Sequence, residues 1–137
     1  MSDMDTSSKG GSSFWTDSVT QAFEDALVAE IKRVFPDGQK IYSQTMVGGI
    51  PPECVIFTAK PMMATHASDS VGRRTMMVDI GVVTEKGNEF AYESLMCMKS
   101  LNFGEIKKPI TGIRFSEVEG IIHMTFYMYI VEVTDFE

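Results

Sequence analysis

The longest regular alternation of apolar and polar positions runs through residues 112–134. From residue 122 every second position is apolar, which is the two-residue period of a β-strand; these positions are Ile122, Met124, Phe126, Met128 and Ile130. The intervening positions are His123, Thr125, Tyr127, Tyr129 and Val131. A shorter alternation precedes Glu119 and Gly120, so the segment predicts a long hairpin that turns at this dipeptide and forms the spine of a sheet.

Two segments have the spacing of amphipathic helices. In residues 14–35 an apolar stripe recurs every three to four positions, at Val19, Phe23, Leu27, Ile31 and Val34. Pro36, Asp37 and Gly38 follow and end this helix. Residues 88–101 carry a second stripe at Ala91, Leu95 and Met98, with Asn88 as the expected N-cap.

The remaining segments predict shorter strands and one long loop. Alternating or continuous apolar runs indicate strands over residues 40–45, 53–58 and 73–84, and a short strand over 105–110. Residues 59–72 have no usable periodicity and include Pro61 and Gly72, so we expect a loop. Because a loop longer than about 12 residues inside a compact domain is usually functional or disordered, we expect this one to make contacts beyond its own subunit.

The order of these elements predicts an α+β fold, with a mainly antiparallel sheet, a long C-terminal hairpin and two helices packed against the sheet. Residues 14–137 form one such domain. Residues 1–13 are rich in Ser, Gly and Asp and have almost nothing to bury, so alone they would be disordered. We expect them to form an extended N-terminal arm that contacts a neighbouring subunit.

Composition narrows the class of protein. The chain has 137 residues, of which 44% are hydrophobic, and 12 basic residues stand against 19 acidic ones, a net charge of −7. This charge opposes sequence-independent binding to nucleic acid. Cys54 and Cys97 lie in apolar runs and are expected to be buried, reduced thiols. No apolar run approaches the ~20 residues that cross a bilayer, so we expect a cytoplasmic protein without membrane contacts.

The sequence offers little for catalysis. Its two histidines, His66 and His123, are not part of a metal-ligand motif, and neither cysteine nor any serine lies in a recognisable nucleophile motif. We therefore expect no catalytic residue, cofactor or metal. Asp79 is an unusual carboxylate because it lies within an apolar strand; the expected role is to face solvent or to pair with an arginine. Tyr127 and Tyr129 favour a face covered by a helix or another subunit over a platform for stacking bases.

An ordered succession of short segments resembles the tail terminator proteins of long-tailed phages and of phage-derived tail particles from Gram-positive bacteria. The first is Glu-Ile-Lys-Arg-Val-Phe-Pro-Asp at 30–37, followed by Lys-Ile-Tyr at 40–42 and Pro-Glu-Cys-Val-Ile-Phe at 52–57. Gly-Arg-Arg-Thr at 72–75, Gly-Ile-Arg-Phe at 112–115 and residues 118–124 complete it. Two features depart from the family pattern: the segment before Phe14 is longer, and the hairpin turn is Glu-Gly where Asp-Gly is more usual.

This resemblance implies a structural virion protein and no enzyme. Members of the family form a ring, expected to be hexameric, that caps the completed tail tube and stops its polymerisation. The ring's partners are the tail tube protein, a neck or head-completion protein and, in contractile tails, the last sheath ring. DNA passes through the lumen only as cargo, and an acidic lumen would not retain it. The implied location is the tail–neck junction of the virion, assembled in the host bacterial cytoplasm.

Nine residues are the candidates for contacts with neighbouring subunits or partners: Met62, Met63, His66, Asp69, Arg73, Arg74, His123, Tyr127 and Tyr129. For Arg73 and Arg74 the alternative is a basic strand entrance on the free surface. Two other functions stay open. One is a different phage neck or head-completion adaptor, and the other is a small α+β enzyme that uses Asp79 or His123 as its acid or base.

Overall fold

The computed structural model describes residues 17–35, 39–43, 51–68 and 71–133. They form two helices and seven strands, so the predicted α+β class is confirmed. In chain order the elements are α2 (Asp17–Val34), β1 (Lys40–Ser43), β2 (Cys54–Ser68), β3 (Val71–Val83), α3 (Asn88–Met96), β4 (Ser100–Phe103), β5 (Ile106–Pro109), β6 (Arg114–Val118) and β7 (Ile121–Val133). The predicted arm, residues 1–13, and the candidate Asp69 lie outside the described residues.

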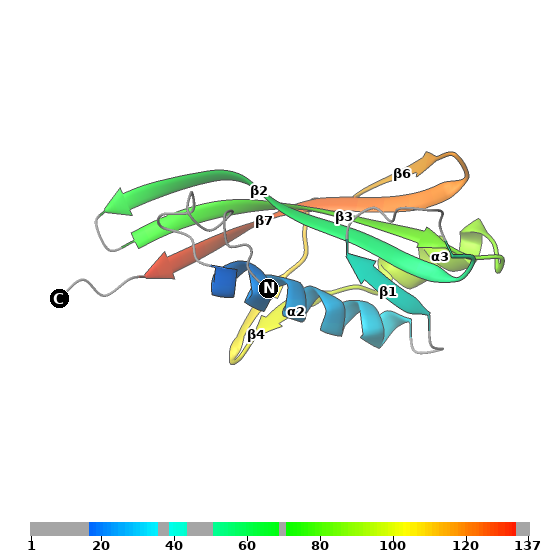
Figure 1. The fold of residues 1–137 in the computed structure, drawn as a ribbon, viewed down its shortest axis with the longest axis horizontal. Coiled ribbons are helices and arrows are strands. Elements are labelled where there is room, and N and C mark those ends of the chain that lie inside the picture. The colour runs from blue at the N-terminus through cyan, green and yellow to red at the C-terminus, as the bar shows by residue number, and fades with distance from the viewer. Residues whose placement is uncertain (1–16, 36–38, 44–50, 69–70, 134–137) are drawn as a thin grey trace, which may run out of the picture.

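The main sheet has five strands in the order β1-β2-β3-β7-β6 (Figure 1). The pairs β2–β3, β3–β7 and β7–β6 are antiparallel, whereas β1 and β2 are parallel. β4 and β5 form a separate two-stranded antiparallel sheet. The expected long final strand is therefore present. It pairs with β3 over residues 122–133 and with β6 over residues 121–125.

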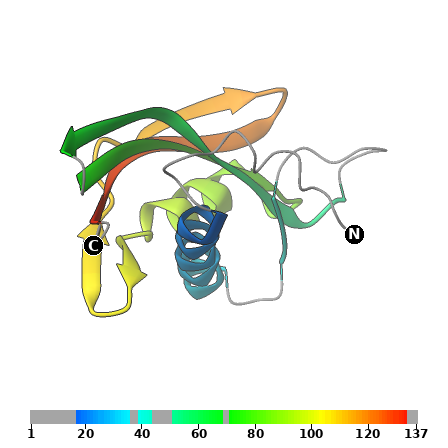
Figure 2. The same ribbon diagram turned by 60° about the vertical axis from the view of Figure 1, so that its left-hand side comes forward.

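Both helices lie against one face of the main sheet (Figure 2). The core between them is built from the inward positions of the strands and the apolar stripes of the helices, namely Phe23, Leu27, Ile31, Met76, Val78, Ile80, Val82, Ala91, Leu95, Ile122, Met124, Phe126 and Met128. The alternation predicted for residues 122–130 is confirmed, with Ile130 partly buried at its end. We call the opposite side of the sheet the outer face.

The hairpin between β6 and β7 turns where it was expected. Glu119 and Gly120 both have positive φ, 52° and 84°, as a two-residue type I′ turn requires. Such a turn matches the right-handed twist of the two strands. Glutamate adopts this conformation less readily than asparagine or aspartate, so the turn is held by the pairing of β6 with β7.

The predicted loop over residues 59–72 is wrong. Residues 59–68 are the second half of β2, and β3 begins at Val71, so most of the segment is a paired strand. The register shifts between Pro61 and Met63 and again between His66 and Ser68. A register shift breaks the two-residue alternation of a strand, which explains why no such period is visible in the sequence.

The second helix is shorter than predicted. α3 ends at Met96, and Ser100–Phe103 forms β4, which pairs with β5. Asn88 is not the N-cap; that position is Gly87, with φ 101° and no side-chain cap. Cys97 is the C-cap of α3 and is exposed, so its predicted burial is wrong, while Cys54 is buried as expected. No helix in the described part of the chain is long and apolar enough to cross a membrane.

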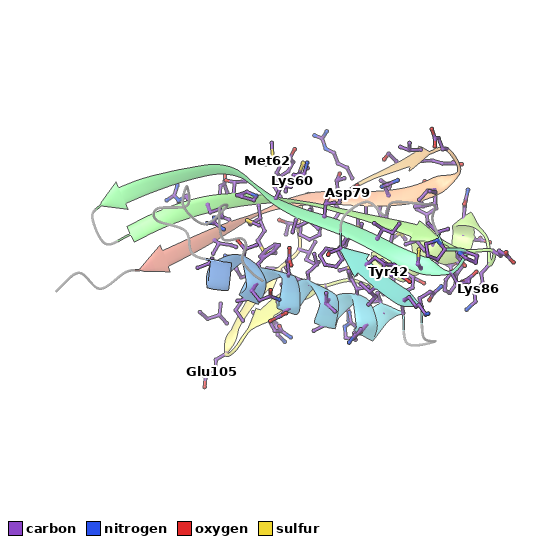
Figure 3. The ribbon with its side chains drawn as sticks, viewed as in Figure 1. Tyr42, Lys60, Met62, Asp79, Lys86 and Glu105 are labelled. Carbon is purple, nitrogen blue, oxygen red and sulfur yellow. The ribbon has the colours of Figure 1, made fainter. Side chains whose placement is uncertain are left out.

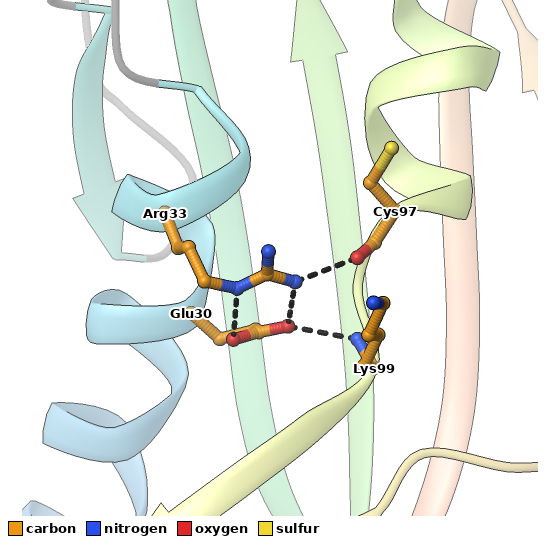
Figure 4. Close-up of polar contacts among 4 residues, drawn as sticks. All are labelled: Glu30, Arg33, Cys97 and Lys99. Carbon is orange, nitrogen blue, oxygen red and sulfur yellow. Dashed lines mark hydrogen bonds and ion pairs between the residues drawn. The ribbon is translucent and has the colours of Figure 1, made fainter.

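A buried carboxylate ties α2 to the segment between α3 and β4 (Figure 4). Glu30 is 7% exposed and accepts two hydrogen bonds from Arg33, from Nε at 3.0 Å and from Nη2 at 2.7 Å. The backbone N–H of Lys99 donates to the same carboxylate at 2.8 Å. Arg33 also donates to the carbonyl oxygen of Cys97 at 2.7 Å. One acid and one base thus join two elements more than 60 residues apart in sequence.

Glu30 makes stability depend on pH in a defined direction. Burial raises its pKa, but hydrogen bonds from Arg33 and from the Lys99 backbone outweigh burial, so the pKa lies below its ordinary value of 4.5. A carboxyl whose pKa falls on folding stabilises the protein above the unfolded pKa, and this contribution is lost as pH falls through the folded pKa. We therefore expect Glu30→Gln to cost most near neutral pH, and chemical denaturation should show the gap to wild type narrowing below pH 4.5. A gap independent of pH would contradict this assignment.

Candidate interaction surface

The outer face of the sheet carries exposed apolar and aromatic side chains. Tyr127 and Tyr129 are 57% and 61% exposed, and Met62 is 55% exposed. In the register, Tyr127 lies opposite Met77 and Tyr129 opposite Thr75 on β3. Lys60, Met62 and Asp79 lie on the side of the sheet away from α2 (Figure 3). These side chains lie on one face of β2, β3 and β7.

Asp79 pairs with His123 on this outer face. Imidazole Nδ1 lies 3.0 Å and 3.2 Å from the two carboxylate oxygens. A carboxylate only accepts hydrogen bonds, so the contact is a hydrogen bond when Nδ1 carries the proton. Both residues stand out in the sequence, but the expected partner of Asp79 was solvent or an arginine, and the partner in the structure is His123. Asp79 lies opposite Thr125, two positions from His123, and such diagonal neighbours can touch across antiparallel strands.

A glycine makes room for the imidazole. Gly81 lies opposite His123 on β3, and a Cβ added at Gly81 would be 3.0 Å from Cε1 and 3.2 Å from Nδ1 of the ring. The ring therefore lies over the β3 backbone. Ser116 is opposite His123 on the other side, on β6. Because the ring leans towards β3, these three polar residues do not form the serine–histidine–carboxylate arrangement that nucleophilic catalysis requires.

Gly81→Ala tests this packing. Because the added methyl is tighter against the ring than ordinary van der Waals contact, we expect the imidazole to move and its contact with Asp79 to lengthen. The free energy of unfolding should change by less than about 1 kcal/mol, since alanine also removes the backbone entropy cost of glycine. NMR resonances of the His123 ring should shift and lose their sensitivity to Asp79→Asn. Unchanged ring resonances would mean that the ring is not seated on Gly81.

Arg73 and Arg74 are separated by the two faces of the strand. Arg73 is exposed, whereas Arg74 is 3% exposed and its Nη1 donates a hydrogen bond to Thr20 Oγ1 of α2 at 2.8 Å. The surface alternative considered for this pair is therefore wrong for Arg74. Arg74 therefore joins β3 to the first turns of α2 from the inward face of the sheet.

The other candidates are only partly placed. Met63 and His66 lie in β2, but their side chains are outside the described set. The outer face adds Lys60, Met77 and Arg114, which sequence reasoning missed; Met77 and Arg114 lie opposite Tyr127 and Thr125. These residues could not be assigned to the outer face from the sequence, because the assignment needs the register between the strands. Among the described residues, no group of three or more His, Cys, Asp or Glu could hold a metal ion.

Comparison with known proteins adds no family assignment. No protein-family model matches the chain, and no curated protein matches it significantly. The resemblance to tail terminators therefore rests on the succession of segments between residues 30 and 124.

Proposed function

We propose that this chain is a tail terminator: a structural virion protein whose subunits form a ring on the completed tail tube. The ring stops polymerisation of the tube protein and offers its other face to a neck or head-completion protein, and to the sheath in a contractile tail. The resemblance supplies the hexameric state and the position at the tail–neck junction. DNA would pass through the ring without specific contacts, as the net charge of −7 favours.

The observation that supports this proposal best is the outer face. Exposed aromatic and methionine side chains are typical of protein interfaces, and here Tyr127, Tyr129 and Met62 share one side of a sheet. Among the described elements, both helices are on the other side. A broad face with exposed aromatic and methionine side chains fits a neighbouring protein layer better than a small-molecule substrate.

Two alternatives are kept. A different neck or head-completion adaptor would use the same face against another ring. A small α+β enzyme would rely on the paired Asp79 and His123, the specific observation in its favour. Electron microscopy of the purified protein, alone, mixed with tail tubes and mixed with head-side proteins, separates these functions. Rings and capped tube ends support the terminator, rings that bind only head-side proteins support the adaptor, and monomers that bind neither assembly contradict both.

Arg73 provides a sharper probe of subunit contacts than Arg74. Arg73→Glu reverses an exposed charge, so we expect the free energy of unfolding to stay within about 0.5 kcal/mol of wild type while ring assembly weakens. Native mass spectrometry measures the assembly. Arg74→Glu would instead place a carboxylate in the core and cannot report on assembly. Unchanged assembly of Arg73→Glu would remove Arg73 from the interface.

A further inference from the structure

The main sheet has an extension with two open edges. β1 pairs with β2 only as far as Phe57, and β6 pairs with β7 only as far as Thr125. Beyond these points the sheet continues as β2, β3 and β7 alone, and in the described part of the chain no other strand pairs with residues 58–68 or 126–133. Figure 1 shows these three strands running past the start of α2.

The β7 edge lacks the features that normally prevent strand pairing. Natural edge strands are protected by charged side chains, prolines or bulges. Residues 126–131 are Phe, Tyr, Met, Tyr, Ile and Val, and their register with β3 is unbroken. A long, flat, uncharged edge of this kind pairs with another strand or aggregates. We therefore expect the edge to be covered in the working state of the protein.

The β2 edge is protected over part of its length. Lys60 is exposed, Pro61 has no backbone donor, and the register shifts between Pro61 and Met63. The next regular stretch runs from Met63 to His66, before the second shift. Any strand that pairs with this edge is thereby confined to a short segment, which fixes its register.

The two edges have matching positions and directions. Thr65, Arg73 and Val131 are at one level across the three strands. β2 and β7 are both antiparallel to β3, so they run in the same direction. Rotation about an axis roughly along the strands keeps that direction and brings the β7 edge of one copy to the β2 edge of the next. Such a contact is heterologous, and it closes into a ring when the rotation closes.

We propose that the β7 edge of one subunit, residues 126–131, pairs in parallel with the β2 edge of the next subunit, around Met63 to His66. The partner is a second copy of this chain, because its β2 supplies the open edge at the same level on the opposite side of the sheet. Pairing of β7 with β7 would be antiparallel and two-fold, and would leave both β2 edges open. That the pairing closes into a ring rests on the proposed function. The pairing itself requires only that subunits associate head to tail.

Amide hydrogen exchange on the wild-type protein tests the pairing directly. In the monomer, alternate amides of residues 126–131 point away from β3 and should exchange quickly, and the same holds for the outer amides of 63–66. In the assembled state both sets should slow by at least 10-fold. Two matched controls are internal: residues 122–125 lie between β3 and β6, and the β3 amides lie between two strands, so both should be protected in either state.

The outcomes separate this proposal from the proposed function. Assembly with new protection at both edges supports the pairing, whether or not the assembly caps tail tubes. Assembly of any size in which the amides of 126–131 stay fast overturns the pairing and leaves the terminator function standing. Protection of 126–131 without protection of 63–66 indicates β7–β7 pairing and also overturns it. A protein that stays monomeric at high concentration and on tail tubes overturns both.

Discussion

Glu30→Ala is expected to lower the free energy of unfolding by about 3 kcal/mol, because a buried unpaired donor costs about 1–3 kcal/mol. The carboxylate accepts hydrogen bonds from the backbone of Lys99 and of Ser100, and alanine leaves both N–H groups without it. The Arg33 contact adds less, since that side chain is half exposed and solvent weakens exposed ion pairs. Urea denaturation followed by circular dichroism measures the loss.

Asp25→Ala is the matched control. Asp25 is an exposed acid on the same helix that accepts a hydrogen bond from Gln21, one turn away, so its removal should change the free energy of unfolding by less than about 0.5 kcal/mol. Arg33→Ala should fall between the two variants, because Glu30 keeps its backbone donors. Equal losses for Glu30→Ala and Asp25→Ala would show that the carboxylate does not hold α2 to the α3–β4 segment.

The sequence predicted the parts of the fold that depend on local periodicity. The stripe at Phe23, Leu27 and Ile31 has the period of a helix, and the alternation that starts at Ile122 has the period of a strand. Both are buried as expected. The turn at Glu119 and Gly120 was also predictable, because a glycine between two alternating runs is a local signal.

The features that the sequence did not predict depend on pairing between residues far apart in the chain. The second half of β2 reads as a loop until β3 supplies its hydrogen-bond partners, and β4 reads as helix until β5 does. The Asp79–His123 pair and the Arg74–Thr20 hydrogen bond join residues 44 and 54 positions apart. No periodicity in the sequence signals either of these two contacts. The sequence therefore predicted single residues of the candidate site, such as Tyr127 and Tyr129. That these residues share one face with residues of β2 and β3 is known only from the strand register.

Arg74 marks where the sheet changes its role. Inward positions on β3 are apolar from Met76 to Val82 and fully or almost fully buried. At position 74 the pattern changes to an arginine that bonds to the beginning of α2. Beyond it, neither α2 nor α3, the two helices of the described residues, lies against the strands. Among the described residues the buried core therefore ends near Arg74, and the stretch of β2, β3 and β7 beyond it is where we propose pairing with another subunit.

Tyr127→Lys combined with Tyr129→Lys is expected to abolish assembly and tube capping while leaving the subunit folded. Both side chains are more than half exposed, so each substitution should change the free energy of unfolding by less than about 1 kcal/mol, the span of strand propensities. Two ammonium groups on one strand must be desolvated when another protein layer covers them, and unpaired buried charge is costly. Native mass spectrometry and electron microscopy with tail tubes measure the loss.

Val118→Lys is the matched control for position on the outer face. Val118 is 52% exposed and lies on the same face, opposite Ile121 beside the β6–β7 turn. It is therefore at the other end of β7 from the open edge. If assembly depends on the extension, the Val118 variant should assemble and cap tubes like wild type. If both variants lose assembly equally, the whole outer face is covered and the extension has no special role. If both retain it, no protein layer covers Tyr127 and Tyr129 on the outer face when subunits assemble.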